Sequence, residues 1–125
     1  MAKIDVRVIL KGIEDNLDLT LKAIKTKNKI NYNENNIKVT IIFTYNEIHM
    51  KRVCNEYEIN LKFKEKEKTI SNYKLFGVNK TFDLETYTSK LLINDDKIVV
   101  DYNLEGNDFS FVLEECHEKS IKGRN

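Results

Sequence analysis

Apolar residues recur at every second position along most of this chain. The clearest runs cover residues 4–10, 37–43, 57–63, 98–104 and 109–113. Because successive side chains of a β-strand point to opposite faces, each run describes a strand with one apolar and one polar face. This period of two predicts strands near residues 3–11, 17–27, 29–33, 36–45, 47–54, 56–66, 72–76, 80–93, 97–105 and 108–115.

Short polar breaks separate the predicted strands. Examples are Asn35-Asn36, Tyr45-Asn46 and Gly106-Asn107, and Asn and Gly suit tight hairpins because they tolerate positive φ. Neighbouring strands should pair antiparallel as a meander, since parallel pairing needs crossover connections for which the chain has no room. So many short strands favour closure, because a closed sheet has no free edges. We therefore predict an all-β fold, a single antiparallel meander β-barrel of about eight to ten strands.

A chain of 125 residues has the usual length of one domain. The barrel domain is expected over residues 1–118, and a frayed tail is expected over residues 119–125, where the alternation fades. The charge-dense segment 62–68 alternates in sign and is expected to be a solvated strand edge, because lysines on an edge discourage further pairing.

Composition narrows the class of partner and the compartment. The 21 Lys and Arg nearly balance the 20 Asp and Glu, which removes any bulk attraction to nucleic acid or anionic membranes. No apolar run approaches the roughly 18 residues of a membrane-spanning helix. The first residues lack the apolar core of a signal peptide, and Cys54 and Cys116 are the only cysteines, so we expect a cytoplasmic protein with packed thiols. Abundant Lys, Asn and Ile favour a bacterial genome rich in adenine and thymine.

The C-terminal part of the chain carries a recognisable succession of residues. Leu75-Phe76-Gly77 leads into an alternating segment over residues 81–88, which is followed by a polar hairpin and then by Tyr102-Asn103-Leu104. This succession resembles the YwiB-like family of small bacterial proteins of unknown function. The resemblance implies a calycin-like β-barrel, related in shape to lipocalins and fatty-acid-binding proteins. Lys74-Leu75 replaces a proline often found in that family, and residues 78–80 look inserted. The resemblance bears on the fold, because none of the matching residues is a catalytic group.

Catalytic chemistry finds little support in the sequence. A catalytic cysteine needs a nearby base, and His49 and His117 are the only histidines. Cys116 and His117 are consecutive, so on one strand their side chains face opposite ways and cannot pair. Cys54 and His49 are an odd number of positions apart and would also face opposite ways. No closely spaced His and Cys set predicts a metal site, and no Gly-x-Gly loop predicts a phosphate site. We expect a non-enzymatic protein without metal or cofactor.

A ligand inside the barrel is the leading functional hypothesis. Barrels of this size can hold a small molecule, and related folds clasp a carboxylate or another polar head with an interior Arg and Tyr. Arg52 lies an even number of positions after Ile48 and Met50, so on a strand all three side chains point to the same face. If that face is internal, the buried guanidinium needs a hydrogen-bonding partner. Tyr45 and Tyr102 lie on apolar faces of other strands and complete the expected site for a small apolar or amphipathic ligand. Alternatively, Arg52 sits at the rim with its head in water, and phenylalanines fill the interior.

Two other classes of function stay open. Single-stranded nucleic acid, RNA above all, would need lysines and aromatic rings on one surface. The candidate sets are Lys22, Lys25, Lys27 and Lys29 with Tyr32, and Lys62, Lys64, Lys66 and Lys68 with Phe63. In the second set the lysines alternate with Phe63, so a solvated face is the favoured interpretation. The third class is a solid barrel whose outer surface contacts a partner protein.

Overall fold

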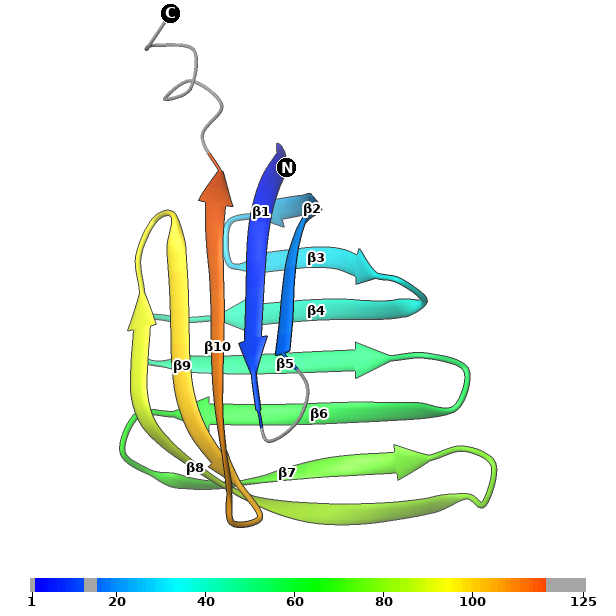
Figure 1. The fold of residues 1–125 in the computed structure, drawn as a ribbon. Coiled ribbons are helices and arrows are strands. Elements are labelled where there is room, and N and C mark those ends of the chain that lie inside the picture. The colour runs from blue at the N-terminus through cyan, green and yellow to red at the C-terminus, as the bar shows by residue number, and fades with distance from the viewer. Residues whose placement is uncertain (1, 13–15, 117–125) are drawn as a thin grey trace, which may run out of the picture.

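The computed structural model describes residues 2–12 and 16–116, so the tail expected over residues 119–125 lies outside the described residues. It contains ten strands, drawn in Figure 1. Their bounds are β1 (Ala2–Lys11), β2 (Asn16–Thr26), β3 (Lys29–Glu34), β4 (Ile37–Phe43), β5 (Glu47–Val53), β6 (Tyr57–Lys64), β7 (Lys68–Leu75), β8 (Lys80–Ile93), β9 (Lys97–Leu104) and β10 (Asn107–Cys116). Each strand pairs antiparallel with the next, and β10 pairs with β1. The predicted meander barrel is therefore confirmed.

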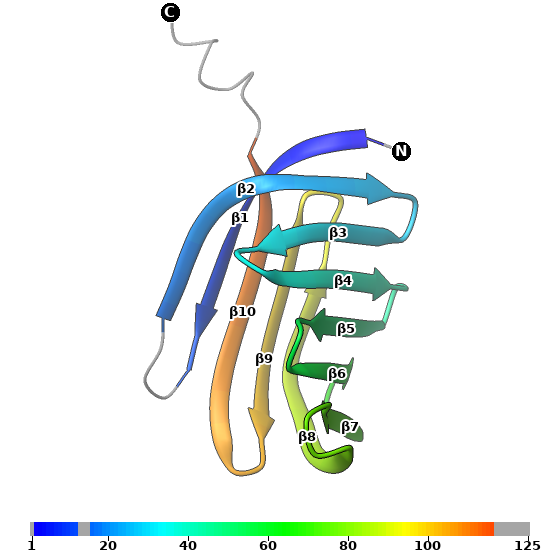
Figure 2. The ribbon, with the colours of Figure 1, turned by 90° about the vertical axis from the view of Figure 1, so that its right-hand side faces the viewer.

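The barrel consists of two sets of strands that cross each other. In Figures 1 and 2, β3 to β7 run across the molecule, whereas β1, β9 and β10 run along it. The long strands β2 and β8 bend and belong to both sets, as Figure 2 shows for β2. In β8 the register shifts between Thr88 and Lys90, and such a bulge lets a strand bend. Crossed sets of this kind bring two apolar faces together around one interior.

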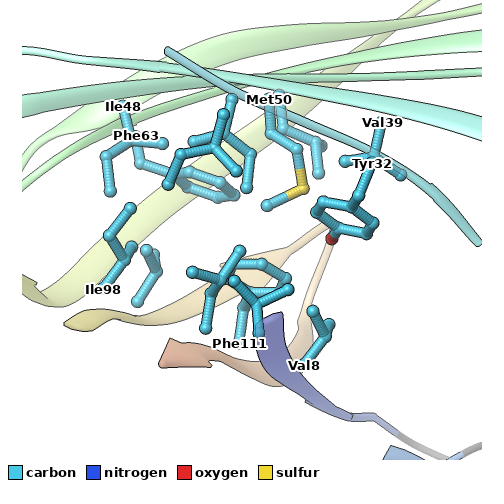
Figure 3. Packing of buried hydrophobic residues seen from close by; sticks show 14 of the residues in the cluster. Val8, Tyr32, Val39, Ile48, Met50, Phe63, Ile98 and Phe111 are labelled. Atoms are coloured by element: carbon cyan, nitrogen blue, oxygen red, sulfur yellow. The ribbon is translucent and has the colours of Figure 1, made fainter. Parts of the chain in front are cut away.

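The inward positions of all ten strands fill this interior. Figure 3 shows Val8 of β1 and Phe111 of β10, which run along the molecule. They face Tyr32, Met50 and Phe63 of β3, β5 and β6, which run across it. Burying one large apolar side chain contributes about 1.5–3 kcal/mol, so this cluster dominates the stability of the fold. The buried hydrophobic residues are Val6, Val8, Ala23, Ile30, Tyr32, Val39, Ile41, Ile48, Met50, Leu61, Phe63, Ile98, Val100, Tyr102, Phe111 and Leu113.

Strand β7 departs from the predicted pattern. It begins at Lys68, whereas the period of two predicted a start near residue 72. The prediction began too late because the first inward positions of the strand carry hydroxyl groups, while the apolar Ile70 points outward and is 61% exposed. The hydroxyl of buried Ser71 accepts a hydrogen bond from the Lys62 amide at 3.0 Å and lies 2.8 Å from the Thr86 hydroxyl. Hydrogen bonding thus replaces apolar packing at these positions, which is why the alternation of hydrophobicity missed them.

The charged segment 62–68 begins where β6 leaves its ladder with β7. β6 pairs with β5 as far as Lys64, but with β7 only from Tyr57 to Asn60. Residues 62–64 therefore have a paired strand on one side only, within a barrel that is closed as a whole. Beyond β6 the chain turns through Lys66 at a φ of 59°, and Glu65 bridges to Thr88 of β8. The charges of this segment therefore lie on the outer face and in a turn.

Hairpin turns fall where Asn and Gly predict them. Asn35 has a φ of 56° between β3 and β4. Between β9 and β10 the turn is Glu105-Gly106, with φ values of 49° and 88°, so Asn107 already belongs to β10. Positive φ at both central residues matches the right-handed twist of the two flanking strands.

Candidate functional site

Arg52 points into the barrel from β5, on the face that it shares with Ile48 and Met50. Its Nη2 donates a hydrogen bond to Oε2 of Glu34 at 2.6 Å, and the two side chains are only 13% and 8% exposed. The inward direction predicted from parity is confirmed. The alternative, a guanidinium in water at the rim, is wrong because Glu34 holds it inside.

The strand register explains why Glu34 reaches Arg52. Tyr32, Val39 and Arg52 lie side by side on β3, β4 and β5. Glu34 is the next inward residue after Tyr32 on β3, so its side chain lies diagonally across one intervening strand from Arg52. Both side chains are long, and their ends meet above the intervening strand at 2.6 Å. Sequence reasoning missed Glu34, although its parity with Ile30 and Tyr32 marks it as inward.

Two polar atoms beside this ion pair have no hydrogen-bond partner among the described residues. They are the second carboxylate oxygen of Glu34, Oε1, and the hydroxyl of Tyr32, and both are buried. Buried polar groups are normally paired, because an unmade hydrogen bond costs about 1–3 kcal/mol. Both atoms therefore retain hydrogen-bonding capacity that the fold does not use.

Burial and the charges of the ion pair shift the pKa values of Arg52 and of the buried tyrosines. Burial opposes the charge of Arg52, but the hydrogen bond and the charge of Glu34 outweigh burial and raise the pKa of Arg52 above its usual value. Burial also raises the pKa of Tyr32, which nearby Arg52 partly offsets and Glu34 increases. Burial raises the pKa of Tyr102 to about 12, against a smaller opposing effect of Arg52. Both phenols thus stay protonated near neutral pH and can donate hydrogen bonds.

The structure brings Tyr102 into the interior but not Tyr45. The ring of Tyr102 lies between Phe63 and Phe109, at centroid distances of 4.5 and 5.4 Å. Tyr45 is 91% exposed in the turn between β4 and β5, so its expected place on an apolar face is wrong. The reason is that β4 ends at Phe43, beyond which strand parity no longer sets the direction of a side chain. We define the polar cluster as Tyr32, Glu34 and Arg52, because the printed ring contacts of Tyr102 are with Phe63 and Phe109.

An aromatic row continues from the cluster towards solvent. Tyr57, Tyr73 and Phe82 form a chain with centroid distances of 5.8 and 6.2 Å, and Phe82 is 45% exposed. In the register Arg52 is followed by Ile59, Tyr73 and Phe82. These residues lie towards the end of the barrel where β3, β5 and β7 finish, which is on the right in Figure 1 and faces the viewer in Figure 2. We refer to it as the Arg52 end.

The lysines of the nucleic-acid hypothesis do not share a surface with its aromatic rings. Lys25 points inward and forms an ion pair with Glu115 at 2.5 Å, and the ring of Tyr32 is buried. In the second set Phe63 is buried, whereas Lys62 lies on the outer face. The predicted separation of rings and cations in the second set is confirmed. In the first set Lys25 and Tyr32 both point inward, so neither belongs to an outer surface.

The thiols and imidazoles form no catalytic pair among the described residues. Cys54 is half-buried and Cys116 is exposed; both are free, so the expectation of a packed thiol is wrong for Cys116. The exposed ring of His49 contacts Glu47 at 3.0 Å, while His117 lies outside the described residues. Within residues 2–12 and 16–116 there is no group of three His, Cys, Asp or Glu able to hold a metal, and no helix long and apolar enough to span a membrane.

Comparisons with known proteins bear on the family and the fold. The family model described as "Domain of unknown function (DUF1934)" matches residues 10–116. The crystal structure of the YwiB protein from Bacillus subtilis is similar, with a TM-score of 0.57 and 14% identity over 92% of this chain and 91% of that one. No curated protein matches the sequence. At this level of identity the likeness to YwiB concerns the fold alone. The chain therefore belongs to the DUF1934 family of proteins of unknown function, with a β-barrel similar to that of YwiB.

Proposed function

We propose that this protein is a non-enzymatic binding module of the bacterial cytoplasm, which holds a small, partly apolar ligand at the Arg52 end of a calycin-like barrel. One observation carries the proposal. The buried ion pair of Arg52 and Glu34 lies beside two buried atoms, Glu34 Oε1 and the Tyr32 hydroxyl, that have no partner among the described residues. A buried ion pair stabilises a fold weakly compared with apolar residues of similar size, so stability alone is a poor reason for it. Convergent polar groups in an apolar interior are typical of ligand sites.

The surroundings of the cluster suggest how such a ligand would lie. Its polar head would contact Arg52, Glu34 and Tyr32, and its apolar part would pack along the partly exposed rings of Tyr73 and Phe82. Aromatic rings offer a large apolar contact at a small cost in side-chain entropy. Neutral phenols and a paired guanidinium position a ligand rather than attack it, which supports binding rather than catalysis.

The test is native mass spectrometry of the protein purified from its own host. A bound small-molecule mass is expected, and Arg52→Ala should abolish it. Tyr32→Phe removes only the hydroxyl, should keep the fold, and should lower the occupancy. Arg7→Ala is the matched control, because Arg7 lies on the outer face in an exposed pair with Asp18. Wild-type protein without added mass, or added mass unchanged by both cluster variants, would overturn the proposal.

The outer face of β4 to β7 supports a second candidate, a protein-interaction module. A groove of about 340 Å³ lies on this face, lined among others by Ile42, His49, Lys62 and Ile70. Ile42 and Ile70 are 43% and 61% exposed, and exposed apolar side chains in one groove are typical of contact surfaces. Crosslinking in host lysate should then capture a partner that Ile70→Asp loses while Arg52→Ala retains it. A partner insensitive to Ile70→Asp would exclude this face.

A further inference from the structure

We infer that the polar cluster selects an uncharged head group that both donates and accepts hydrogen bonds, such as a primary amide or a lactam, over a carboxylate. This inference rests on the proposed function, because it concerns the ligand of the same site. It also departs from the expectation that an interior Arg clasps a carboxylate, and the reason is the partner that Arg52 already has.

The first argument concerns charge. Arg52 and Glu34 compensate each other at 2.6 Å, and both side chains are largely removed from water. A carboxylate placed beside them would create one positive and two negative charges in the barrel interior. Weakly screened like charges repel strongly, and each ion must also lose its hydration. An uncharged head group avoids both costs.

The second argument concerns the acceptor. Oε1 of Glu34 is buried without a donor among the described residues, while Oε2 accepts from Arg52. A ligand group next to Oε1 must therefore supply an N–H or O–H. An ionised carboxylate offers only acceptors, so it leaves Oε1 unpaired and faces it with a second anion. The NH₂ of an amide or the N–H of a lactam supplies the missing donor.

The third argument concerns the donor. The Tyr32 hydroxyl is buried without a partner, and Tyr32 and Glu34 occupy successive inward positions on β3. Burial raises the pKa of Tyr32, so its hydroxyl keeps the proton that it can donate to a carbonyl oxygen. The inward face of one strand thus carries both a free acceptor and a free donor. An amide or lactam carries an N–H for the acceptor and a carbonyl oxygen for the donor, whereas a carboxylate carries acceptors alone.

Two probes of equal chain length separate the head groups. Octanamide and octanoate are titrated into the folded protein near neutral pH, where octanoate is ionised, and binding is measured by calorimetry. Wild-type protein should bind octanamide at least about tenfold more tightly than octanoate. Glu34→Gln leaves the charge of Arg52 uncompensated, so the order should reverse. Glu114→Gln, on the outer face of β10, is the control and should leave both affinities unchanged.

Tyr32→Phe provides a test that does not alter any charge. Losing one hydrogen bond to the carbonyl should weaken octanamide binding about fivefold and affect octanoate less. A wild-type preference for octanoate, an order unchanged by Glu34→Gln, or an amide affinity unchanged by Tyr32→Phe would overturn the inference and leave the proposed function standing. If wild-type protein binds neither probe, the proposed function is overturned, and the inference with it.

Discussion

The buried pair of Arg52 and Glu34 allows a quantitative test of how the barrel interior is built. Arg52→Met and Glu34→Leu each leave one charged group without its partner, whereas the double variant replaces the pair with two apolar side chains of similar volume. The variants form a double-mutant cycle, which isolates the free energy of interaction between the two side chains.

The expected magnitude follows from burial. Removing one partner of a buried pair costs about 3–5 kcal/mol, because the remaining charge is neither hydrated nor compensated. Arg52 and Glu34 are 13% and 8% exposed, so little water reaches either group. In Glu34→Leu the long stem of Arg52, near the end of β5, lets the freed head move towards solvent, which favours the lower bound, about 3 kcal/mol. Arg52→Met leaves the shorter and more buried Glu34 side chain behind, so it should cost at least as much. The double variant should lie within about 1 kcal/mol of the wild type or above it.

Urea unfolding followed by far-ultraviolet circular dichroism measures these differences, since the chain has no tryptophan for fluorescence. With an m-value of about 1–3 kcal/mol per molar urea, each single variant should lower the midpoint by roughly 1–3 M. The exposed pair of Arg7 and Asp18 is the control, and its cycle should be close to additive. An additive cycle at Arg52 and Glu34, with the double variant as unstable as the sum of the singles, would refute the reasoning.

Three further predictions concern stability. Burial raises the pKa of Tyr102 to about 12 from 10.0, so the folded state holds this proton more tightly, and the free energy of unfolding should fall by roughly 1.4 kcal/mol per unit as the pH rises from about 10 to 12. Tyr102→Phe should show a weaker fall in urea titrations at about pH 9 and 11, and equal falls would contradict this assignment. Gly106 has a φ of 88°, so Gly106→Ala should lower the free energy of unfolding by about 1 kcal/mol in thermal unfolding. Gly77 has open space around it and no positive φ, so Gly77→Ala should change stability by less than about 0.5 kcal/mol. Equal effects of the two substitutions would exclude backbone strain as the cause. Phe63→Ala should cost about 3–5 kcal/mol because Phe63 is fully buried, and Phe82→Ala, at 45% exposure, should cost clearly less in calorimetry. Similar losses would show that Phe63 does not anchor the core.

The alternation of apolar and polar residues determined most of the architecture by itself. Strand faces follow directly from a period of two, and Asn and Gly between the strands mark hairpins, so both the meander and its closure could be predicted. The same parity correctly placed Arg52 inward, beside Ile48 and Met50. Parity failed at Tyr45, because it fixes the direction of a side chain only as long as the strand continues. It also missed the start of β7, where buried hydroxyls replace apolar side chains.

Only the tertiary structure decided which inward residues meet. Arg52 and Glu34 are 18 positions apart in sequence, and their contact depends on the register of β3, β4 and β5 and on the length of each hairpin. A pattern along one strand contains no information about its diagonal neighbours two strands away. The sequence therefore determined that a guanidinium enters the barrel and needs a partner. The fold supplied Glu34 as that partner, placed Tyr32 beside it, and so set the charge of the cluster, because electrostatics in an apolar interior depend on distances that only the closed sheet fixes.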